Sequence, residues 1–420
     1  MSRLISVARK LQGSQLSVQA LSRLSSVILF LLASWADGTR LPLVALQGAL
    51  LALPFTLMES LVGRPVSAGL LPRDWDIESW ARRAALATIL PVALIGGVSA
   101  AVALPDVTWT DRLLMLTPVL LQLPLEAAFW AMARTRNTRE ANLIPQTVAV
   151  GTILVGAVFA LVGMRVDVAA VPGQVAVLAW LLLRRRSLAP GTVRPGYVAS
   201  IRVGAAYFVT ASVDLTYSVA LPSVAGALAG PEAVIVLRAM ELAFGPFHVT
   251  LSATTREDVV LGRATKWINP TRLLTVAGWA VVSAIVLFSP WVRGLLADDL
   301  RDLALGAVAA YCGYKGLLMF STWLSVRHMI WATPRRYLVS GVGSRVIALG
   351  GLAISVFWVE RVPQLFLQLL IVEALVILWF VWRMAGTPDI PDPRADDTVE
   401  IPLPIADPAA TAELQAYWLK

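Results

Sequence analysis

Charged residues are scarce in this sequence. They make up 15% of its 420 residues, while hydrophobic residues make up 57%. A soluble domain carries roughly 25% charged residues. The mean hydropathy is +0.72. One water-soluble core cannot hide so much apolar surface, but a lipid bilayer would solvate it. The composition therefore indicates a membrane protein.

Cysteine and histidine are also scarce: the sequence has Cys312, His248 and His328. A single cysteine excludes a disulfide framework and a cysteine metal site. Two histidines leave little for metal binding or histidine catalysis. The sequence lacks a G-x-x-x-x-G-K-[ST] loop and an H-E-x-x-H motif, which argues against a built-in ATPase or a zinc hydrolase. We therefore expect no cofactor, no metal and no catalytic residue, and we do not expect an enzyme.

Long apolar segments recur along the chain. They fall at 17–36, 41–63, 84–104, 112–133, 143–163, 167–183, 198–228, 232–254, 273–295, 302–326, 337–359 and 364–384. Most reach the roughly 20 residues that a helix needs to cross the hydrocarbon, whereas barrel strands would be about ten residues long. The pattern predicts an all-α polytopic membrane protein of about twelve transmembrane helices.

Basic residues concentrate in alternate loops between these segments. One set of loops holds about 21 of the 35 lysines and arginines. The opposite set holds six arginines: Arg40, Arg112, Arg165, Arg293, Arg301 and Arg361. The positive-inside rule then places both termini in the cytoplasm of a bacterial cell with the protein in its inner membrane. The net charge of +8 is explained by these loops, so we expect no nucleic-acid partner.

The order of features predicts two related halves. An amphipathic basic loop follows the second segment (72–83) and another follows the eighth (254–272). We predict an N-terminal six-helix lobe at 1–183, a cytoplasmic linker at 184–197 and a C-terminal six-helix lobe at 198–385, with a central cavity between the lobes. The Pro- and Asp-rich residues 386–420 predict a disordered cytoplasmic tail, which polysaccharide-assembly proteins could bind.

Charges inside the apolar segments are the candidate functional residues. A charge at bilayer depth costs several kcal/mol, so it usually faces a wet cavity or a partner. The candidates are Arg23, Glu59, Glu126, Asp214, Arg238, Glu241, Lys315 and Arg345. Arg238 and Glu241 share one helix face, which leaves both a self-neutralising brace and a cavity role open. For Arg23 and Lys315 the alternatives are pairing across helices with an acid or contact with a ligand anion.

Three segments resemble the multidrug/oligosaccharidyl-lipid/polysaccharide (MOP) flippase superfamily, especially its polysaccharide-exporter and lipid-II-flippase-like branches. They are ALSRLSSVILFLLA (20–33), SVDLTYSVALPSVAGALAGPEAV (212–234) and ELAFGPFHVTLSATTREDVVLGRATK (241–266). The resemblance covers nearly all of residues 1–385. The glycine and aromatic residue that usually follow Pro-Glu in the family are replaced here by 234–237.

The resemblance implies a flippase that moves a lipid-linked oligosaccharide or polysaccharide precursor by alternating access. Four bases would bind the phosphate of a polyprenyl carrier among the membrane lipids: Arg23, Arg238, Lys315 and Arg345. Four acids would bind a coupling ion or pair with the bases: Glu59, Glu126, Asp214 and Glu241. Two alternatives stay open. One is a MATE-like exporter of small organic cations, which requires an acidic cavity. The other is a non-transporting scaffold subunit of a polysaccharide-assembly complex.

Overall fold

The computed structural model describes residues 15–63, 65, 74–134, 138–183, 193–251, 254, 270–296, 298–331 and 334–385. The predicted tail and most of the predicted linker lie outside these residues. The described chain is helical, and its only β pairing is an isolated bridge between Trp75 and Val193. The prediction of an all-α fold is confirmed.

The first half of the chain forms a closely packed group of helices. They are α2 (Gln15–Ala36), α3 (Leu41–Leu50), α4 (Ala52–Met58), the π-helix η2 (Glu59–Gly63), α6 (Ile77–Ala103), α7 (Trp109–Arg134), α8 (Thr138–Leu161) and α9 (Ala170–Leu183). Within this group α6 packs on α7, α2 on α8, and α8 on α9. We call it the N-terminal lobe.

The second half forms a separate group. It begins with α10 (Tyr197–Arg202) and α11 (Ala205–Ala229), followed by α12 (Pro231–Ala243) and a helix at Gly245–Leu251. It continues with α14 (Pro270–Phe288), α15 (Pro290–Leu296), α16 (Asp298–Arg301), α17 (Leu305–Trp331), α18 (Pro334–Ser355) and α19 (Val362–Ala385). Its densest packing joins α17 and α18 to α19. We call it the C-terminal lobe.

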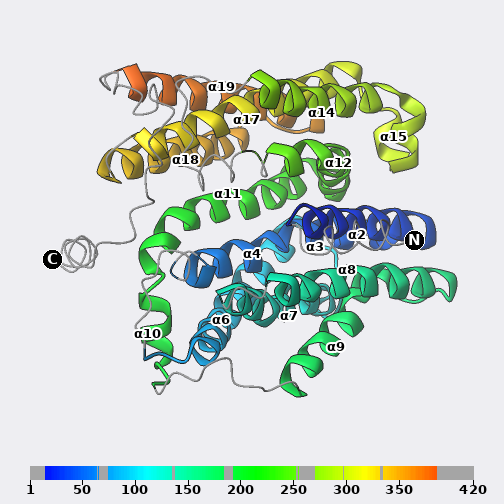
Figure 1. The fold of residues 1–420 in the computed structure, drawn as a ribbon. Helices are drawn as coiled ribbons and strands as arrows, with labels where there is room; N and C mark the ends of the chain where they lie inside the picture. The colour runs from blue at the N-terminus through cyan, green and yellow to red at the C-terminus, as the bar shows by residue number, and fades with distance from the viewer. Residues whose placement is uncertain are drawn as a thin grey trace, which may run out of the picture.

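The two lobes meet along α11 and α12. Figure 1 shows these helices between the blue-to-teal N-terminal lobe and the yellow-to-orange helices of the C-terminal lobe. In the described chain α11 packs against α6 and α4, and α12 packs against α3. This contact surface, which we call the lobe seam, is where any ligand held between the halves would lie.

Each predicted apolar segment coincides with one of these helices or with a run of consecutive helices. By length and composition alone, six helical runs in the described chain can cross a membrane, or up to eight if each bent pair is one span. The remaining segments correspond to shorter apolar helices within α2, α11 and α18, and to α17.

The ninth segment differs from its prediction as one continuous span. The helix over 273–288 and the helix Pro290–Leu296 meet at an angle of 91°. Pro290 lacks an N–H donor and disfavours helical backbone at the residue before it, so the helix breaks at Ser289. The eighth span is also bent, by 57°, between Pro231–Ala243 and Gly245–Leu251.

The turn between α11 and α12 has a clear local cause. Gly230 adopts a φ of 80°, a left-handed conformation that glycine enters without steric cost. Pro231 then occupies the first turn of α12, where its missing N–H has no partner to lose. This turn sets the direction of α12 along the lobe seam, and α12 carries two of the candidate charges.

Glycines bring α11 close to the N-terminal lobe at both of its ends. A Cβ on Gly204 would lie 2.6 Å from the Leu61 carbonyl oxygen, and a Cβ on Gly226 would lie 2.6 Å from that of Ala103. Near the second contact, the hydroxyl oxygens of Ser99 and Ser223 are 2.5 Å apart. The lobe seam is therefore packed at both ends of α11.

Candidate functional site

Five charged or titratable side chains gather at the lobe seam. We call Arg23, Arg238, Glu241, His248 and Lys315 the central cluster. They come from α2, α12, the helix Gly245–Leu251 and α17. Arg23 interacts electrostatically with Arg238, His248 and Lys315, so the fold joins charges that are nearly 300 residues apart in sequence into one field.

Glu241 lies at the middle of the central cluster. Its Oε1 contacts Lys315 Nζ and accepts a hydrogen bond of 2.9 Å from the Tyr311 hydroxyl. Its Oε2 lies 3.2 Å from His248 Nε2. The bend after α12 folds the next helix back, so that His248 reaches Glu241 seven residues earlier. A buried ion pair is tolerated only when further polar contacts satisfy the carboxylate, and Glu241 has such contacts.

The partner of Glu241 is on another helix. Sequence spacing suggested that Arg238 could neutralise it along α12, but the ion pair forms across the lobe with Lys315 of α17. Arg238 still interacts electrostatically with Glu241, but the close ion pair of Glu241 is the one between helices. Pairing with an acid on another helix is one of the two alternatives that the sequence leaves open for Lys315.

Two aromatic rings enclose Lys315. Its Nζ lies 5.1 Å from the Tyr311 ring centroid and 4.9 Å from that of Tyr314. The side chain of Lys315 is only 1% exposed, so these cation–π contacts act in a desolvated site, where they are strongest. The spacing in AYCGYKGLL, with tyrosines four and one residues before the lysine, is the sequence signal that could have identified them.

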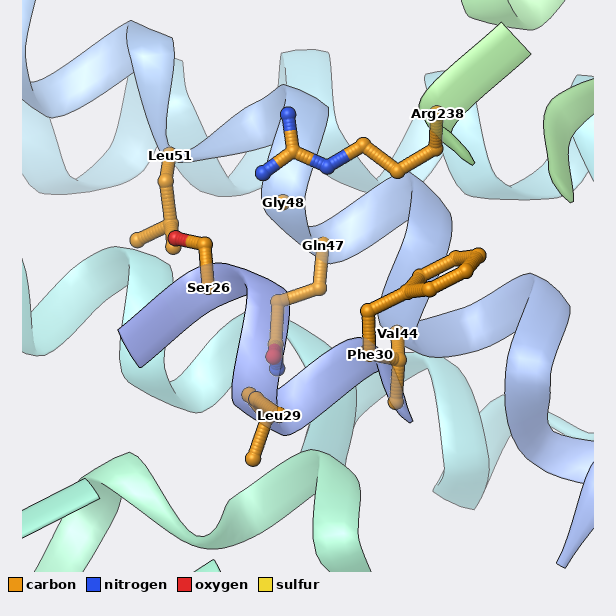
Figure 2. A pocket seen from close by; sticks show the side chains of 8 residues that line it. All are labelled: Ser26, Leu29, Phe30, Val44, Gln47, Gly48, Leu51 and Arg238. Atoms are coloured by element: carbon orange, nitrogen blue, oxygen red, sulfur yellow. The ribbon is translucent and has the colours of Figure 1, made fainter. Parts of the chain in front are cut away.

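The Arg238 side chain lies in a small pocket between the lobes. Figure 2 shows its guanidinium beside Gly48 of α3. The pocket is lined by Ser26, Leu29, Phe30, Val44, Gln47, Gly48, Leu51 and Arg238. Within the part of the chain that the structure describes, the guanidinium makes no hydrogen bond or ion pair. Arg238 therefore presents several N–H donors to the pocket.

Gly48 creates the space for this guanidinium. A Cβ on Gly48 would lie 2.7 Å from Arg238 Nε, closer than van der Waals contact allows. The neighbouring Gln47 side chain is already occupied, since its Nε2 donates to the carbonyls of Met115 and Asp167 at 2.8 and 2.7 Å. The pocket therefore offers mainly the arginine to a ligand.

Arg23 and Arg345 extend the positive region on either side. Arg23 is exposed on α2, three residues before the pocket residue Ser26, and so on the same helix face. Arg345 on α18 interacts electrostatically with Tyr217 and Glu373. Glu373 accepts a hydrogen bond from the Ser321 hydroxyl. Arg23, Arg238, Lys315 and Arg345 are thus linked electrostatically to the carboxylates Glu241 and Glu373.

The other predicted acids belong to α7, to η2 and to α11, and η2 packs against α11 at the lobe seam. Glu126 accepts a 2.9 Å hydrogen bond from Gln122 Nε2, and Gln122 Oε1 in turn accepts one of 3.0 Å from Gln174. This chain of bonds ties α7 to α9 within the N-terminal lobe. Glu59 begins η2 and is half-buried. Asp214 belongs to α11, but its side chain is outside what the structure describes.

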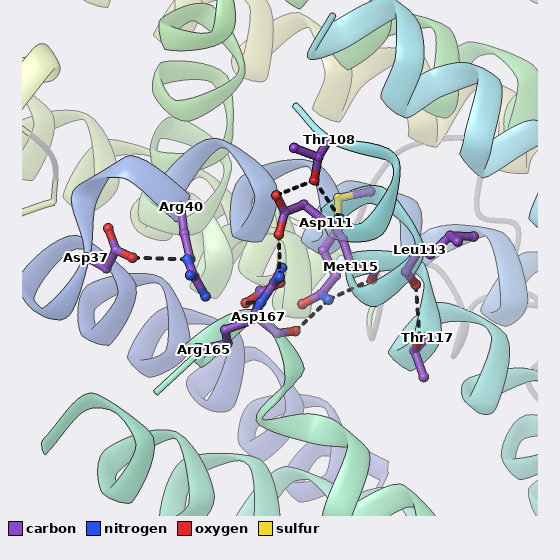
Figure 3. A network of polar contacts seen from close by, with 10 residues as sticks. Asp37, Arg40, Thr108, Asp111, Leu113, Met115, Thr117, Arg165 and Asp167 are labelled. Atoms are coloured by element: carbon purple, nitrogen blue, oxygen red, sulfur yellow. Dashed lines mark hydrogen bonds and ion pairs between the residues drawn. The ribbon is translucent and has the colours of Figure 1, made fainter. Parts of the chain in front are cut away.

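A second charged network lies where α2, α7 and α9 approach their connecting segments. Figure 3 shows Asp37 with Arg40, and Asp111 and Asp167 with Arg165. Arg40 Nε lies 3.1 Å from Asp37, and Arg165 contacts Asp111 and lies 2.6 Å from Asp167. The hydrogen-bonded Asp167 carboxylate raises the pKa of Arg165, which stays charged. We call this group the loop network; its acids outnumber its bases.

No family model and no curated protein matches this chain. Its structure is similar to that of the lipid II flippase MurJ in an inward closed conformation, with a TM-score of 0.65 and 12% identity over 88% of this chain and 87% of that chain. It is also similar to the eukaryotic MATE transporter AtDTX14, with a TM-score of 0.56 and 12% identity over 91% and 96% of the two chains.

A third similar structure is an inward-facing multidrug resistance MATE family transporter of the MOP superfamily. Its TM-score is 0.53, at 15% identity over 87% of this chain and 94% of that chain. At such identities the similarity establishes the fold alone. The chain shares the helical fold of these three structures, as the sequence predicted.

Proposed function

We propose that this protein is a flippase that moves the head group of a lipid-linked oligosaccharide or polysaccharide precursor across the membrane. The observation that carries the proposal is the group of bases at the lobe seam: Arg23, Arg238 and Lys315 share one electrostatic field. The guanidinium of Arg238 makes no hydrogen bond or ion pair within the described chain. Such a site attracts an anion. The phosphate that links a glycan to its lipid is the anion that a bilayer protein meets.

Arg238 is the best-placed phosphate ligand. Its guanidinium lies in the pocket between α2 and α3 without a protein partner in the described chain. A guanidinium binds a phosphate through two parallel N–H donors, which gives both affinity and orientation. Arg23, on the same side of α2 as the pocket, would supply a second positive charge. The lipid tail would remain in the bilayer while the glycan occupies the space between the lobes.

The lobe seam supports alternating access as the transport mechanism. The contacts at the two ends of α11, at Gly204 with Leu61 and at Gly226 with Ala103, are short backbone approaches rather than large hydrophobic surfaces. Rocking one lobe against the other would open one contact while the other stays closed. The coupling ion, and the roles of Glu59, Glu126 and Asp214 in binding it, remain predictions from the sequence.

A MATE-like exporter of small organic cations shares the fold but needs a site with excess negative charge. The unpartnered Arg238 and the lysine at the seam oppose this alternative. A non-transporting scaffold would need neither an open arginine nor a pocket at the seam. The proposed location is the bacterial inner membrane with both termini in the cytoplasm. Cysteine labelling tests this orientation: position 108 should react from outside and position 138 from inside.

The function is tested by depleting the protein in its own cells and following the lipid-linked precursor. We expect the precursor to accumulate on the inner leaflet and surface glycan to fall. Normal surface glycan and normal precursor orientation in a clean deletion would contradict the proposal. Loss of surface glycan with normal precursor orientation would favour the scaffold alternative.

A further inference from the structure

Glu241 is placed where the anionic group of a ligand would be expected. Its carboxylate neutralises Lys315, the most buried base of the central cluster. The Glu241 side chain is 28% exposed while that of Lys315 is 1% exposed. A ligand entering from the lobe seam therefore meets the carboxylate before it meets the ammonium group.

Glu241 also has more partners than a simple ion pair needs. The Tyr311 hydroxyl donates to the same oxygen that Lys315 contacts, and His248 lies 3.2 Å from the other oxygen. If Lys315 turned to another anion, the Tyr311 hydroxyl would still donate to the carboxylate, and His248 would remain beside it. Displacement would then avoid the large cost of leaving a buried charge without a partner.

Arg238 and Glu241 lie one turn apart on α12 but point to different neighbours. Arg238 enters the pocket beside α3, and Glu241 faces α17. Arg238 nevertheless interacts electrostatically with Glu241, so an anion held by Arg238 acts on the same carboxylate that pairs with Lys315. The Lys315 ammonium group can therefore pair either with Glu241 or with a ligand anion, and the two ion pairs compete.

We infer that the Glu241 carboxylate occupies the place of the ligand phosphate while no ligand is bound. A ligand must compete with this carboxylate for Lys315, so the site selects ligands by their charge, and we call this selection the charge filter. This inference rests on the proposed function. Only an anion that attracts Lys315 more strongly than the Glu241 carboxylate does will displace that carboxylate from Lys315. A phosphate monoester carries about −1.5 to −2 charges at pH 7, whereas a phosphodiester lipid carries one, the same as Glu241. A glycan linked to its lipid through a single phosphate is likewise a phosphodiester with one charge, whereas a pyrophosphate linkage carries two. The filter therefore admits glycans linked through pyrophosphate and free polyprenyl phosphate, and it rejects the ordinary phospholipids of the bilayer.

Binding measurements on the purified full-length protein in detergent test the filter with two probes, undecaprenyl phosphate and phosphatidylglycerol. The native protein should prefer undecaprenyl phosphate. Glu241→Gln should bind both probes more tightly, and phosphatidylglycerol should gain at least about tenfold more, which corresponds to the lowest coupling energies measured for close charge pairs. Glu232→Gln is the matched control, because it removes an acid from the first turn of the same helix, nine residues before Glu241. Its preference should stay native.

The outcomes separate this inference from the proposed function. If Arg23→Gln and Arg238→Gln each bind undecaprenyl phosphate as the native protein does, the proposed function fails. If both bind it weakly but Glu241→Gln keeps the native preference, the filter alone is overturned. Where Glu241→Gln does not fold, as judged by its melting temperature, Glu241→Asp replaces it. The shorter acid should lower the preference partially, and an unchanged preference would overturn the filter.

Discussion

The loop network and the central cluster use the same residue types to opposite effect. In the loop network each arginine lies on an aspartate: Arg40 on Asp37, and Arg165 on Asp111 and Asp167. In the central cluster Lys315 and His248 lie on Glu241, whereas the guanidinium of Arg238 makes no ion pair within the described chain. The comparison shows that a basic residue in a membrane protein indicates a function only when its partner is known. Arginines paired with acids stabilise the fold, whereas an arginine without an ion pair at a lobe seam is available to a ligand.

The largest effect should follow from removing both open arginines. The double variant Arg23→Gln, Arg238→Gln should fold normally but lose transport of the lipid-linked precursor by about 100-fold or more, because two charge-assisted contacts to phosphate are each worth about 1.5–3 kcal/mol. The measurement is precursor flipping in reconstituted vesicles, with melting temperature as the check on folding. Arg40→Gln, from the loop network, is the matched control and should transport normally. Full activity in the double variant would remove both residues from the mechanism.

The loop network should respond in the opposite way, with lost stability and retained ligand affinity. Arg165→Ala strands Asp167, whose side chain is fully buried, and should cost about 3–5 kcal/mol of unfolding free energy. Thermal unfolding in detergent measures this, and Arg165→Ala with Asp167→Asn should recover most of the loss. Native stability in Arg165→Ala would mean that the loop network does not brace the N-terminal lobe. Lost affinity in a folded variant would break the comparison between the two networks.

The sequence predicts the fold better than it predicts the pairing of charges. Apolar length and the alternation of basic loops suffice for the twelve segments, because both are local properties that the bilayer imposes. The charge partners depend on which helices meet. Glu241 finds Lys315 seventy-four residues away only because α12 and α17 pack in the same lobe. No spacing rule within one helix contains that information.

Local features were also predicted unevenly. We predicted one span at 273–295, although Pro290 breaks it. The mean hydropathy of a segment is not sensitive to one missing N–H donor. Glu373 accepts a hydrogen bond from the Ser321 hydroxyl, and its electrostatic interactions with Arg345 and Lys315 place it at the margin of the candidate site.

A smaller effect is expected from wedging the lobe seam at one end of α11. Gly226→Val would place its side chain against the Ala103 backbone, where even a Cβ would lie 2.6 Å from the carbonyl oxygen. The lobes must separate there, so we expect transport to fall about tenfold while ligand affinity stays within about twofold, since a rocking motion is needed for turnover but not for binding. Cysteine accessibility at position 99 should rise. Gly278→Val, at a site with nothing within 4 Å of the added atom, is the control.

The smallest effect should come from Gly48, and it tests whether the open arginine must point into the pocket. In Gly48→Ala the added methyl group would lie 2.7 Å from the Arg238 guanidinium, which is the far end of a flexible side chain and can swing aside. Stability should therefore change by less than about 1 kcal/mol, because alanine also favours the helix over glycine. Affinity for undecaprenyl phosphate should fall about threefold to tenfold, since a displaced guanidinium loses one of its two parallel contacts. Gly97→Ala is the control: it adds the same methyl group to a helix where nothing lies within 4 Å, and its affinity should be native. An unchanged affinity in Gly48→Ala, with Arg238→Gln still defective, would mean that the charge of Arg238 acts on the ligand without the aligned geometry that the pocket provides.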